Sequence, residues 1–488
     1  MKNLFPALIL FCLCAGIFSS CKDDSFTSDS SYKLIFSTDI LSFDTVFTSV
    51  VTPTKRIMVY NSTSENIRIE SIVLFSNRNC FQVNVNGKSG NVFQNVELRS
   101  KDSLYIFVKV MVKELGQYAP LQILDSLVFR YNNNIQKVML QTHGQDVHLL
   151  RGVSITEDTR WLNDKPYLIY DVLTVANGAT LEIDAGAKLY FHNKATMEVR
   201  GTLNVNGDAS NPVIFRGDRT DNLYDELPYD KLPGQWGGIL LTKESTGNRI
   251  NGAMIRNGTF GIQVDPAEIE TGVYRLILSN SQIHNTKQAA LKATNANVYV
   301  YNSVISNGAY ACVLLEGGEY LFNHCTIANY PKNTRVYGAL ILANHPQFDN
   351  QKLIPLKADF NNCIIYGTFQ QEMKMYNTEG TGDATSNFNY KFNSCLIRYQ
   401  PNQYTPEFNH KSDAFKNVIW NENPNFLSVD NDSYNFHIGA VSAAIAKGNP
   451  EIIVTYPECA ADKDAVNRSY DEKPDIGAYE YVPLKNVD

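Results

Sequence analysis

A short phrase recurs along the second half of this 488-residue chain: a small residue, a pair ending in isoleucine, and a turn residue two places later. Three successive copies place Ile283, Ile305 and Ile327 at intervals of 22 residues. Short strands that repeat at such a period must stack on their neighbours to bury an apolar face. The repeat therefore predicts a solenoid of short parallel strands, a parallel β-helix. The six copies occupy residues 253–257, 281–285, 303–307, 325–329, 363–367 and 395–399.

The columns of the repeat predict which side chains pack and where the chain turns. The central isoleucine of each copy should point inward and stack on the isoleucine of the next coil. The turn column holds residues that enter the left-handed region of φ and ψ at least cost. Its asparagines could also hydrogen-bond from coil to coil. This column contains Asn257, Asn285, Asn307, Asn329 and Gly367, whereas the last copy has Tyr399 there.

Two further segments extend the pattern and carry a family resemblance. Residues 180–183 (Thr-Leu-Glu-Ile) recur as 202–205 (Thr-Leu-Asn-Val), again 22 residues on. This stretch resembles the first coils of bacterial right-handed parallel β-helix proteins of the pectate-lyase-like type, and residues 475–480 resemble their C-terminal cap. The resemblance implies a β-helix with a C-terminal cap over residues 149–488. It leaves function open, because this fold is shared by lyases, hydrolases, adhesins and inert scaffolds.

The N-terminus has the pattern of an export signal rather than of a folded element. A lysine precedes an apolar run from Leu4 to Phe18, which is short for a membrane span. The run ends at Cys21 after two serines, and it resembles the lipobox of bacterial lipoproteins. The resemblance implies that residues 1–20 are a signal peptide and that the Cys21 thiol is lipidated. An ordinary signal peptide with an incidental cysteine is the alternative.

The residues after the predicted lipidation site bear on location. Lys22, Asp23 and Asp24 resemble the surface-export signal of Bacteroides-type lipoproteins. This implies a protein anchored by lipid in the outer membrane and displayed on the cell surface, with a periplasm-facing lipoprotein as the alternative. The net charge of −7 argues against a nucleic-acid partner, which would select a basic face.

The segment between the anchor and the solenoid reads as a separate domain. Residues 21–34 are polar and predict a lipidated tether. Residues 35–148 alternate apolar and polar positions, as in 104–110, with turn signals such as Asn86-Gly87 between the runs. This predicts an antiparallel β-sandwich. The segment is similar to immunoglobulin-like domains of the ASPM/hydin type, so the expected fold class is all-β, an Ig-like sandwich followed by the β-helix.

The nine cysteines do not form a metal-site pattern. Cys12 and Cys14 leave with the predicted signal peptide, and Cys21 is the predicted lipidation site. Three of the other six fall in the small-residue column and are expected to be buried thiols. No CxxC or Cys/His cluster has zinc-site spacing, so no metal centre and no cofactor is predicted from them. The six are Cys80, Cys312, Cys325, Cys363, Cys395 and Cys459.

One acidic insert is a candidate ligand site. Clustered carboxylates can bind calcium, and two carboxyl groups held roughly 5–10 Å apart can act as acid and base. Calcium is therefore the one cofactor that the sequence raises. The alternative is a solvated loop between two coils. The insert contains Asp218, Asp221, Asp225, Glu226 and Asp230.

Long inserts at 330–357, 367–391 and 399–436 interrupt the repeat and carry many aromatic residues. Insertions in a solenoid leave from one turn and collect on one face, so an exposed aromatic surface is predicted there. It would suit a glycan or a protein partner. The alternative is that the aromatics pack the inserts onto the solenoid. They are Tyr330, Tyr337, Phe348, Phe369, Tyr376, Tyr390, Tyr404, Phe408 and Trp420.

These features favour a non-catalytic binding or structural module that contacts a polysaccharide or a partner protein through the insert face. A polysaccharide lyase or glycoside hydrolase acting in the same groove is the first alternative. For a lyase, Lys332 and Arg335 could supply a basic pair, although two basic residues in a loop are more often solvated. An accessory lipoprotein of an outer-membrane assembly, in contact with an outer-membrane protein, is the second alternative. No catalytic residue is assigned.

Overall fold

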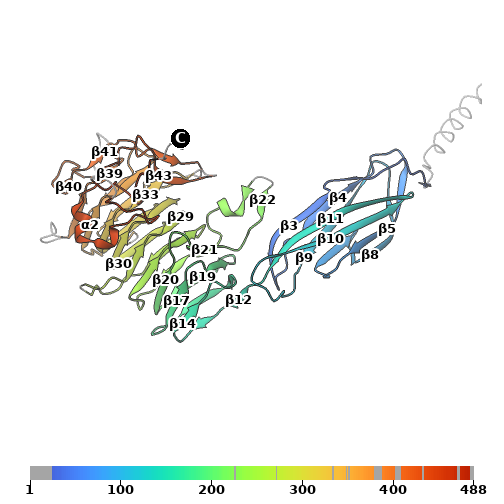
Figure 1. Ribbon diagram of the computed structural model, residues 1–488, viewed down its shortest axis with the longest axis horizontal. Coiled ribbons are helices and arrows are strands. Elements are labelled where there is room, and N and C mark those ends of the chain that lie inside the picture. The colour runs from blue at the N-terminus through green and yellow to red at the C-terminus, as the bar shows by residue number, and fades with distance from the viewer. Residues whose placement is uncertain are drawn as a thin grey trace, which may run out of the picture. The chain divides into compact units, whose positions relative to one another are not determined.

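The computed structural model describes two compact units, Met1–Asp146 and Val147–Asp488, which we treat separately. Both are built from β-strands, and the second contains large parallel sheets (Figure 1). No helix in the described part of the chain is long and apolar enough to span a membrane. The predicted signal peptide and residues 21–24 lie outside the described residues, which are 25–224, 227–270, 272–331, 335–347, 349, 352–378, 387–401, 408–430, 433–469 and 473–483.

The first unit packs two sheets around one apolar core. Buried residues from both sheets, such as Ile106 in one and Phe129 in the other, belong to the same cluster. The first sheet contains β1 (Phe26–Thr27), β5 (Asn66–Phe75), β8 (Val92–Leu98), β10 (Leu121–Tyr131), β11 (Asn134–Gln145) and β3 (Ile40–Phe47). The second contains β2 (Ile35–Phe36), β4 (Lys55–Tyr60), β9 (Ser103–Val110), β6 (Phe81–Val85) and β7 (Lys88–Gly90).

The sequence predicted antiparallel pairing in this unit, but not all of its strand pairs are antiparallel. β3 pairs with β11 in parallel, and β1 pairs with β5 in parallel. The hairpins follow the turn chemistry, because Asn86 and Gly87 both have positive φ (49° and 78°) between β6 and β7. Hairpins require antiparallel neighbours, whereas a strand added at a sheet edge from a distant segment can run either way.

In the second unit the chain passes repeatedly through two parallel sheets, one of 11 and one of 17 strands (Figure 1). The smaller sheet contains, in spatial order, β12 (His148–Arg151), β15 (Tyr167–Tyr170), β18 (Lys188–Phe191), β21 (Val213–Gly217), β26 (Ala253–Arg256), β29 (Gln282–Thr286), β31 (Val304–Gly308), β33 (Thr326–Asn329), β36 (Ile364–Gly367), β39 (Leu396–Ile397) and β41 (Ile419–Trp420). We call one pass of the chain a coil.

The larger sheet holds two ladders that meet in its longest strands, β30 (Leu291–Tyr301) and β32 (Val313–Asn323). One ladder contains β13 (Ser154–Ile155), β16 (Val172–Val175), β19 (Thr196–Val199), β24 (Ile239–Leu241), β27 (Ile262–Val264), β34 (Leu340–Ala343) and β37 (Met373–Tyr376). The other contains β14 (Thr159–Trp161), β17 (Thr180–Asp184), β20 (Thr202–Asn206), β25 (Asn248–Asn251), β28 (Leu276–Ser279), β35 (Leu356–Asn361), β38 (Phe388–Asn393) and β40 (Phe415–Lys416).

The predicted isoleucine column is confirmed. Ile283 is the register partner of Ile305, and Ile305 is the partner of Ile327. All three are fully buried in the apolar cluster that runs through the coils. The column continues into Ile365 and Ile397. Neighbouring coils therefore bury each other's apolar face, as a period of 22 residues requires.

The turn prediction is right for three residues and wrong for two. Asn257, Asn285 and Asn307 have left-handed φ values of 65°, 57° and 55°, and Asn285 Nδ2 donates to Asn257 Oδ1 at 2.8 Å. Asn329 and Gly367 do not have positive φ. They end β33 and β36, and the chain continues through residues 330–339 to β34 and through residues 368–372 to β37.

A second column of residues with left-handed φ values was not predicted from the sequence. It lies one residue before each small residue of the phrase, at the opposite end of the same strands. Its side chains also bond between coils, since Asn302 Nδ2 donates to Asn280 Oδ1 at 3.3 Å and Asn362 Nδ2 lies 2.9 Å from His324 Nε2. The column contains Gly252, Asn280, Asn302, His324, Asn362, Ser394 and Asn417.

The predicted inserts 330–357 and 367–391 are not simple interruptions, which corrects the sequence reading. Each contains a strand of the larger sheet: β34, in which all four residues are buried, or β37, in which Met373 and Met375 are buried. Each insert therefore carries a complete pass of the chain through the larger sheet. Apolar side chains at alternate positions direct a strand into the core even where the spacing of the phrase is lost.

The six remaining cysteines are free and buried. The closing run 475–480 lies against the smaller sheet, where Gly477 N donates to Asn362 O at 2.8 Å and Ala478 N donates to Thr326 Oγ1 at 3.0 Å. The rest of this C-terminal segment contributes the short elements β42 (Phe426–Ser428), β43 (Asn435–Ile438), α2 (Glu451–Thr455) and η3 (Pro457–Cys459).

Candidate functional site

Three loops and the start of β37 form an open groove with a cavity volume of about 610 Å³. The loops follow β33, β36 and β39, which are consecutive in the smaller sheet, so these segments lie beside one another at one corner of successive coils. We call this site the insert groove. It is lined by Val336, Tyr337, Thr368, Phe369, Gln370, Gln371, Lys374, Gln400 and Pro401.

Two aromatic rings, together with Val336 and Pro401, provide the apolar surface of the insert groove. Phe369 is 39% exposed, and the guanidinium carbon of Arg335 lies 3.5 Å from the centroid of its ring. Tyr337 meets Tyr310 edge to face, with 4.7 Å between ring centroids. The Lys374 ammonium lies 5.5 Å from the Tyr337 ring. Both rings are thus supported by neighbours, and Phe369 keeps a substantial exposed surface.

The other predicted insert aromatics have a different role. Tyr376 is 40% exposed but does not line the insert groove. Four others are partly buried against apolar clusters, as expected if the aromatics pack the inserts onto the solenoid. They are Tyr330, Tyr390, Phe408 and Trp420. Phe348 and Tyr404 lie outside the described residues.

A buried ion pair holds two walls of the insert groove together. Glu372 is fully buried, and its two carboxylate oxygens accept from Arg335 Nη2 at 2.7 Å and Nη1 at 2.9 Å. The same oxygens accept from Phe369 N at 2.7 Å and Ala339 N at 2.9 Å. Burial raises the pKa of Glu372, and the Arg335 guanidinium and the two N–H donors oppose that effect.

This pair corrects the prediction for the first insert. Arg335 was expected in a solvated loop beside Lys332, but it is only 7% exposed and its Nη1 also donates to Asn329 O at 3.1 Å. Lys332 lies outside the described residues. Arg335 therefore acts as a structural clamp and does not belong to an open basic pair.

Backbone hydrogen bonds join the second and third loops. Gln400 N donates to Gln370 O at 2.8 Å, and Glu372 N donates to Arg398 O at 3.1 Å. Between the first and second loops, the chain at Gly338 packs so closely that a Cβ there would lie 2.6 Å from the Glu372 carbonyl carbon. The groove is thus built on cross-linked loops, which favours a fixed binding surface.

The lining of the insert groove lacks the groups that glycoside hydrolysis requires. None of its nine described lining residues is Asp, Glu or His. Glycosidases generally use two carboxyl groups, roughly 5–10 Å apart, on either side of the scissile bond. The nearest carboxylate in sequence, Glu372, is buried and occupied by four donors. A ligand would meet amides, two hydroxyl groups, an ammonium, aromatic rings and the aliphatic side chains of Val336 and Pro401.

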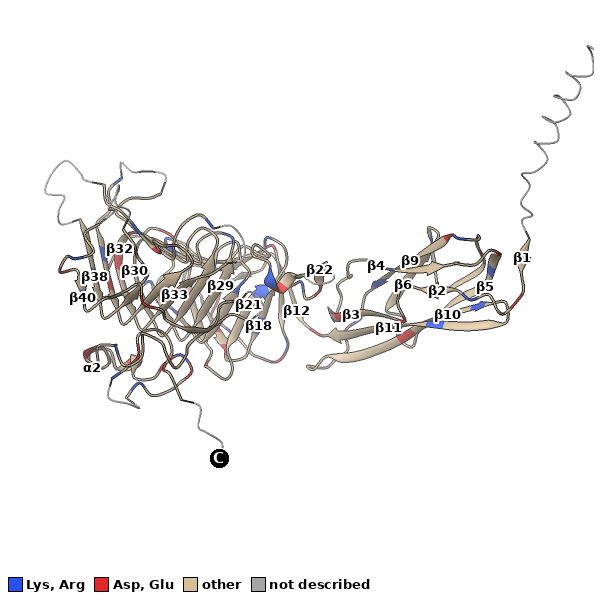
Figure 2. Cartoon of the chain, turned by 90° about the horizontal axis from the view of Figure 1, so that it is seen from above, with Lys and Arg blue, Asp and Glu red and all other residues tan. Residues whose placement is uncertain are grey.

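The described carboxylates of the acidic insert each lie against a basic side chain. His192 Nδ1 lies 2.7 Å from Asp218 Oδ2. Arg219 binds Asp221 through two nitrogens, each 2.6 Å from a carboxylate oxygen. Figure 2 shows basic and acidic segments interleaved around β21 and the β22–β23 hairpin of this insert (Asn222–Tyr224 and Leu227–Pro228).

The predicted calcium loop gains no support from this geometry. Calcium takes six to eight oxygen ligands, and a carboxylate already bound by a cation is a poor donor. Asp225 and Glu226 lie outside the described residues. Among the described residues, no group of three or more His, Cys, Asp or Glu side chains is placed to hold a metal ion.

Asp230, the last acidic residue of the insert, contacts a row of side chains that was not predicted from the sequence. It bridges Arg216 (Nη2–Oδ1, 3.1 Å) and Arg256 (Nη2–Oδ2, 3.2 Å) on the outer face of the smaller sheet. His284 follows Arg256 in register, and burial, with Arg256 as the lesser cause, lowers its pKa to about 4. The signal was present in the sequence: Arg256 and His284 both occupy the position before the turn residue.

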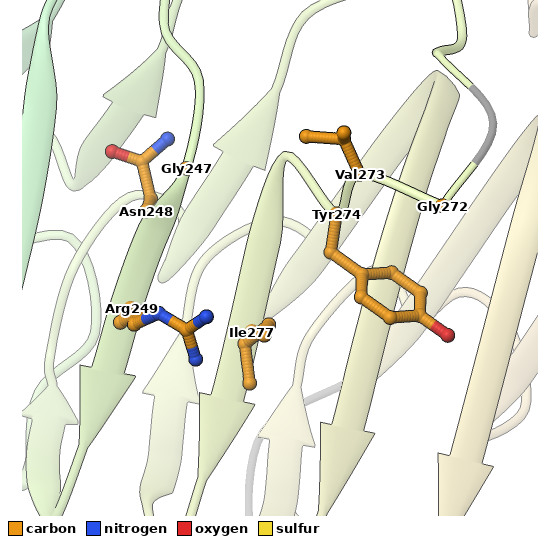
Figure 3. Close-up of a pocket in the computed structure, with 7 residues that line it drawn as sticks. All are labelled: Gly247, Asn248, Arg249, Gly272, Val273, Tyr274 and Ile277. Carbon is orange, nitrogen blue, oxygen red and sulfur yellow. The ribbon is translucent and has the colours of Figure 1, made fainter.

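A smaller hollow of about 180 Å³ lies at another corner of the coils, between the turns at Gly247 and Gly272 (Figure 3). Arg249, Tyr274 and Ile277 line its outer side. Figure 3 shows the Arg249 guanidinium directed toward Ile277, while Asn248 points away from both. We assign this hollow no role.

Comparisons with known proteins leave the chain without an assigned family. No protein-family description matches the sequence, and no curated protein matches it. Among solved structures, the catalytic domain of a GH87 α-1,3-glucanase in complex with nigerose is similar over 76% of this chain and 88% of its own, with 10% identity and a TM-score of 0.22.

Two other similar structures match much less of the chain. A family 123 glycoside hydrolase from Clostridium perfringens has 4% identity over 23% of this chain and a TM-score of 0.17. The Vibrio cholerae VesB protease has 13% identity over 24% of this chain and a TM-score of 0.18. This chain spans about a quarter of the first and a third of the second. At these TM-scores none of the three likenesses supports an assignment of fold or activity.

Proposed function

We propose that this protein is a lipid-anchored lipoprotein of the outer membrane, displayed on the cell surface, that binds a glycan without cleaving it. In this proposal an immunoglobulin-like domain spaces a right-handed parallel β-helix from the membrane. The insert groove is the binding site. The observation that carries the proposal is its lining, which combines exposed aromatic surface with amide groups and contains no Asp, Glu or His among its described residues.

The chemistry of the lining fits a sugar chain. A pyranose ring has an apolar face that stacks on an aromatic ring, and Phe369 offers an exposed one. Its hydroxyl groups both donate and accept hydrogen bonds, as the amides of Gln370, Gln371 and Gln400 do. A cavity of about 610 Å³ is within the range of small-molecule sites.

The test is incubation of the mature protein, without lipid, with a panel of host and plant polysaccharides, followed by sizing of both the glycan and the complex. We expect intact glycan to migrate with the protein. Phe369→Ala should weaken binding at least about tenfold, since the central anchor residues of a binding site contribute about 2 kcal/mol or more and about 1.4 kcal/mol corresponds to tenfold. Phe107→Ala is the matched control, because that ring is 43% exposed on the first unit and should leave affinity unchanged.

The other outcomes separate the alternatives. Shortened chains or new unsaturated ends would make the protein a polysaccharide lyase or glycoside hydrolase and would end the binding proposal. No interaction with any glycan would favour the accessory role, in which the rigid coils contact an outer-membrane protein.

The anchoring has its own test. Cys21→Ala should move the protein from the membrane fraction to the soluble fraction, because the acyl chains on that thiol are the proposed anchor. Replacing Lys22, Asp23 and Asp24 together by alanine should keep the membrane association but protect the protein from protease added to intact cells. Continued membrane association of the Cys21→Ala protein would contradict lipidation at this residue.

A further inference from the structure

A row of polar side chains crosses the outer face of the smaller sheet at the acidic insert. Tyr190 is the register partner of Arg216, and Arg256 is the partner of His284. Because Phe215 pairs with Ile255, the register places Arg216 next to Arg256. We call these four residues, Tyr190, Arg216, Arg256 and His284, the arginine row. They are brought together by stacking of coils, not by closeness in sequence.

The two arginines are partly buried and share one carboxylate. The side chains of Arg216 and Arg256 are 12% and 27% exposed, and Asp230, which bridges them, is 35% exposed. Asn257 Nδ2 also donates to Asp230 Oδ1 at 3.1 Å, which fixes the carboxylate between the guanidinium groups. Each arginine places one Nη2 on Asp230, and Arg216 also donates from Nε to Gly217 O at 3.1 Å and from Nη2 to Arg219 O at 2.8 Å.

The charges of the arginine row do not balance in this arrangement. A guanidinium stays protonated in proteins, so the pair carries two positive charges against the one negative charge of Asp230. His284 is uncharged near neutral pH, because its pKa is about 4. The Nε of Arg256 is buried and has no hydrogen-bond partner among the described residues. Buried donors and charges without partners are unfavourable, and a second anion would relieve both.

We propose that the arginine row is a binding site for an oxyanion group, a carboxylate or a sulfate, and that Asp230 occupies it in the free protein. Paired guanidinium groups bind such planar or tetrahedral anions through several parallel hydrogen bonds. Tyr190 and His284 flank the pair: the Arg216 guanidinium lies 5.7 Å from the Tyr190 ring, and His284 Nδ1 lies 3.0 Å from Ser306 Oγ. This site is separate from the insert groove, so the inference does not depend on the proposed glycan binding there.

The experiment measures binding of sodium sulfate, of glucuronate and of glucose to the mature protein by calorimetry at constant ionic strength. Asp230→Asn removes the internal carboxylate but keeps the shape of the side chain. We expect it to tighten binding of at least one of the two anions by about tenfold or more. Asp184→Asn is the matched control, because Asp184 pairs with Arg160 on the exposed surface (2.8 Å), and it should not change anion binding.

A second variant tests the guanidinium pair directly. Arg256→Lys keeps the positive charge but loses the fork, and it should remove the gain produced by Asp230→Asn when the two changes are combined. Thermal unfolding of each variant shows whether it is folded. If Arg256→Lys is unfolded, the ring signals of His284 in nuclear magnetic resonance provide the second measurement. An anion bound beside the ring should raise the pKa of His284, whereas glucose should not.

The outcomes decide the proposal. Binding of both anions identifies the shared oxyanion as the ligand, binding of sulfate alone points to a sulfate ester, and binding of glucuronate alone points to an acidic sugar. Failure of both anions to bind the Asp230→Asn protein at millimolar concentration would overturn the site. The proposal would also be overturned if the protein with both Asp230→Asn and Arg256→Lys bound anions as tightly as the Asp230→Asn protein. The same holds if the Asp184→Asn control bound anions as tightly as the Asp230→Asn protein.

Discussion

Replacing Glu372 by glutamine is expected to destabilise the second unit by about 3 kcal/mol or more, because breaking a buried ion pair leaves an uncompensated charge in the interior. The side chains of Glu372 and Arg335 are 0% and 3% exposed, so solvent cannot compensate the stranded guanidinium. Glutamine also presents an amide –NH₂ to a site that consists of donors. Denaturant unfolding of the full mature chain, followed by a probe in the second unit, measures the loss.

The matched control is an exposed ion pair in the same unit. Arg200 binds Glu198 at 2.5 Å, with the arginine side chain 55% exposed, and Glu198→Gln should change stability by less than about 1 kcal/mol. Adding Arg335→Met to Glu372→Gln should recover part of the lost stability, because the stranded charge is removed. Equal losses for Glu372→Gln and Glu198→Gln would show that the Glu372–Arg335 pair does not hold the loops together.

Replacing Ile305 by alanine is expected to destabilise the second unit by about 3 kcal/mol, the usual loss when a large aliphatic side chain is removed from a core without relaxation of its surroundings. Ile305 is fully buried and lies between Ile283 and Ile327 in the column. Each coil is fixed by hydrogen bonds to the coils on both sides, so the backbone cannot close the cavity. Denaturant unfolding of the full mature chain again provides the measurement.

An isoleucine on the outer side of the same sheet provides the comparison. Ile214 is only partly buried in β21, between two inward-facing residues. Its replacement by alanine removes the same atoms from a position that is less enclosed, and should destabilise by about 1 kcal/mol or less. Similar losses at Ile214 and Ile305 would contradict the assignment of inner and outer faces.

The candidate site was only partly predictable. The insert positions located the corner at which the loops collect, and Tyr337 and Phe369 were among the aromatics expected on the exposed surface. The insert sequences did not separate these two from Tyr390 and Trp420, which pack against the core. Whether a ring faces solvent depends on what lies beneath it, and an insert without periodicity does not specify its neighbours.

The partners of the charged residues were likewise not predictable from the sequence. The acidic insert was recognised as a cluster, but Asp218 and Asp230 are bound by side chains that lie outside it, His192, Arg216 and Arg256. Arg335 in an insert looked like a solvated residue, and it is buried on Glu372, 37 residues away in sequence. Pairs of this kind depend on register between coils and on loop packing.

The sequence by itself determined that this chain folds into all-β structure with long parallel sheets. A repeated phrase of one strand and one turn specifies its own inward face, and identical columns stack because each coil can bury its apolar side only against the next. Tertiary structure alone decided the lengths of the loops around each coil, the clamp between Arg335 and Glu372, the insert groove, and the sharing of Asp230 by two arginines. The physical reason is that periodicity is local information, whereas a site is formed by side chains that meet only after the coils have stacked.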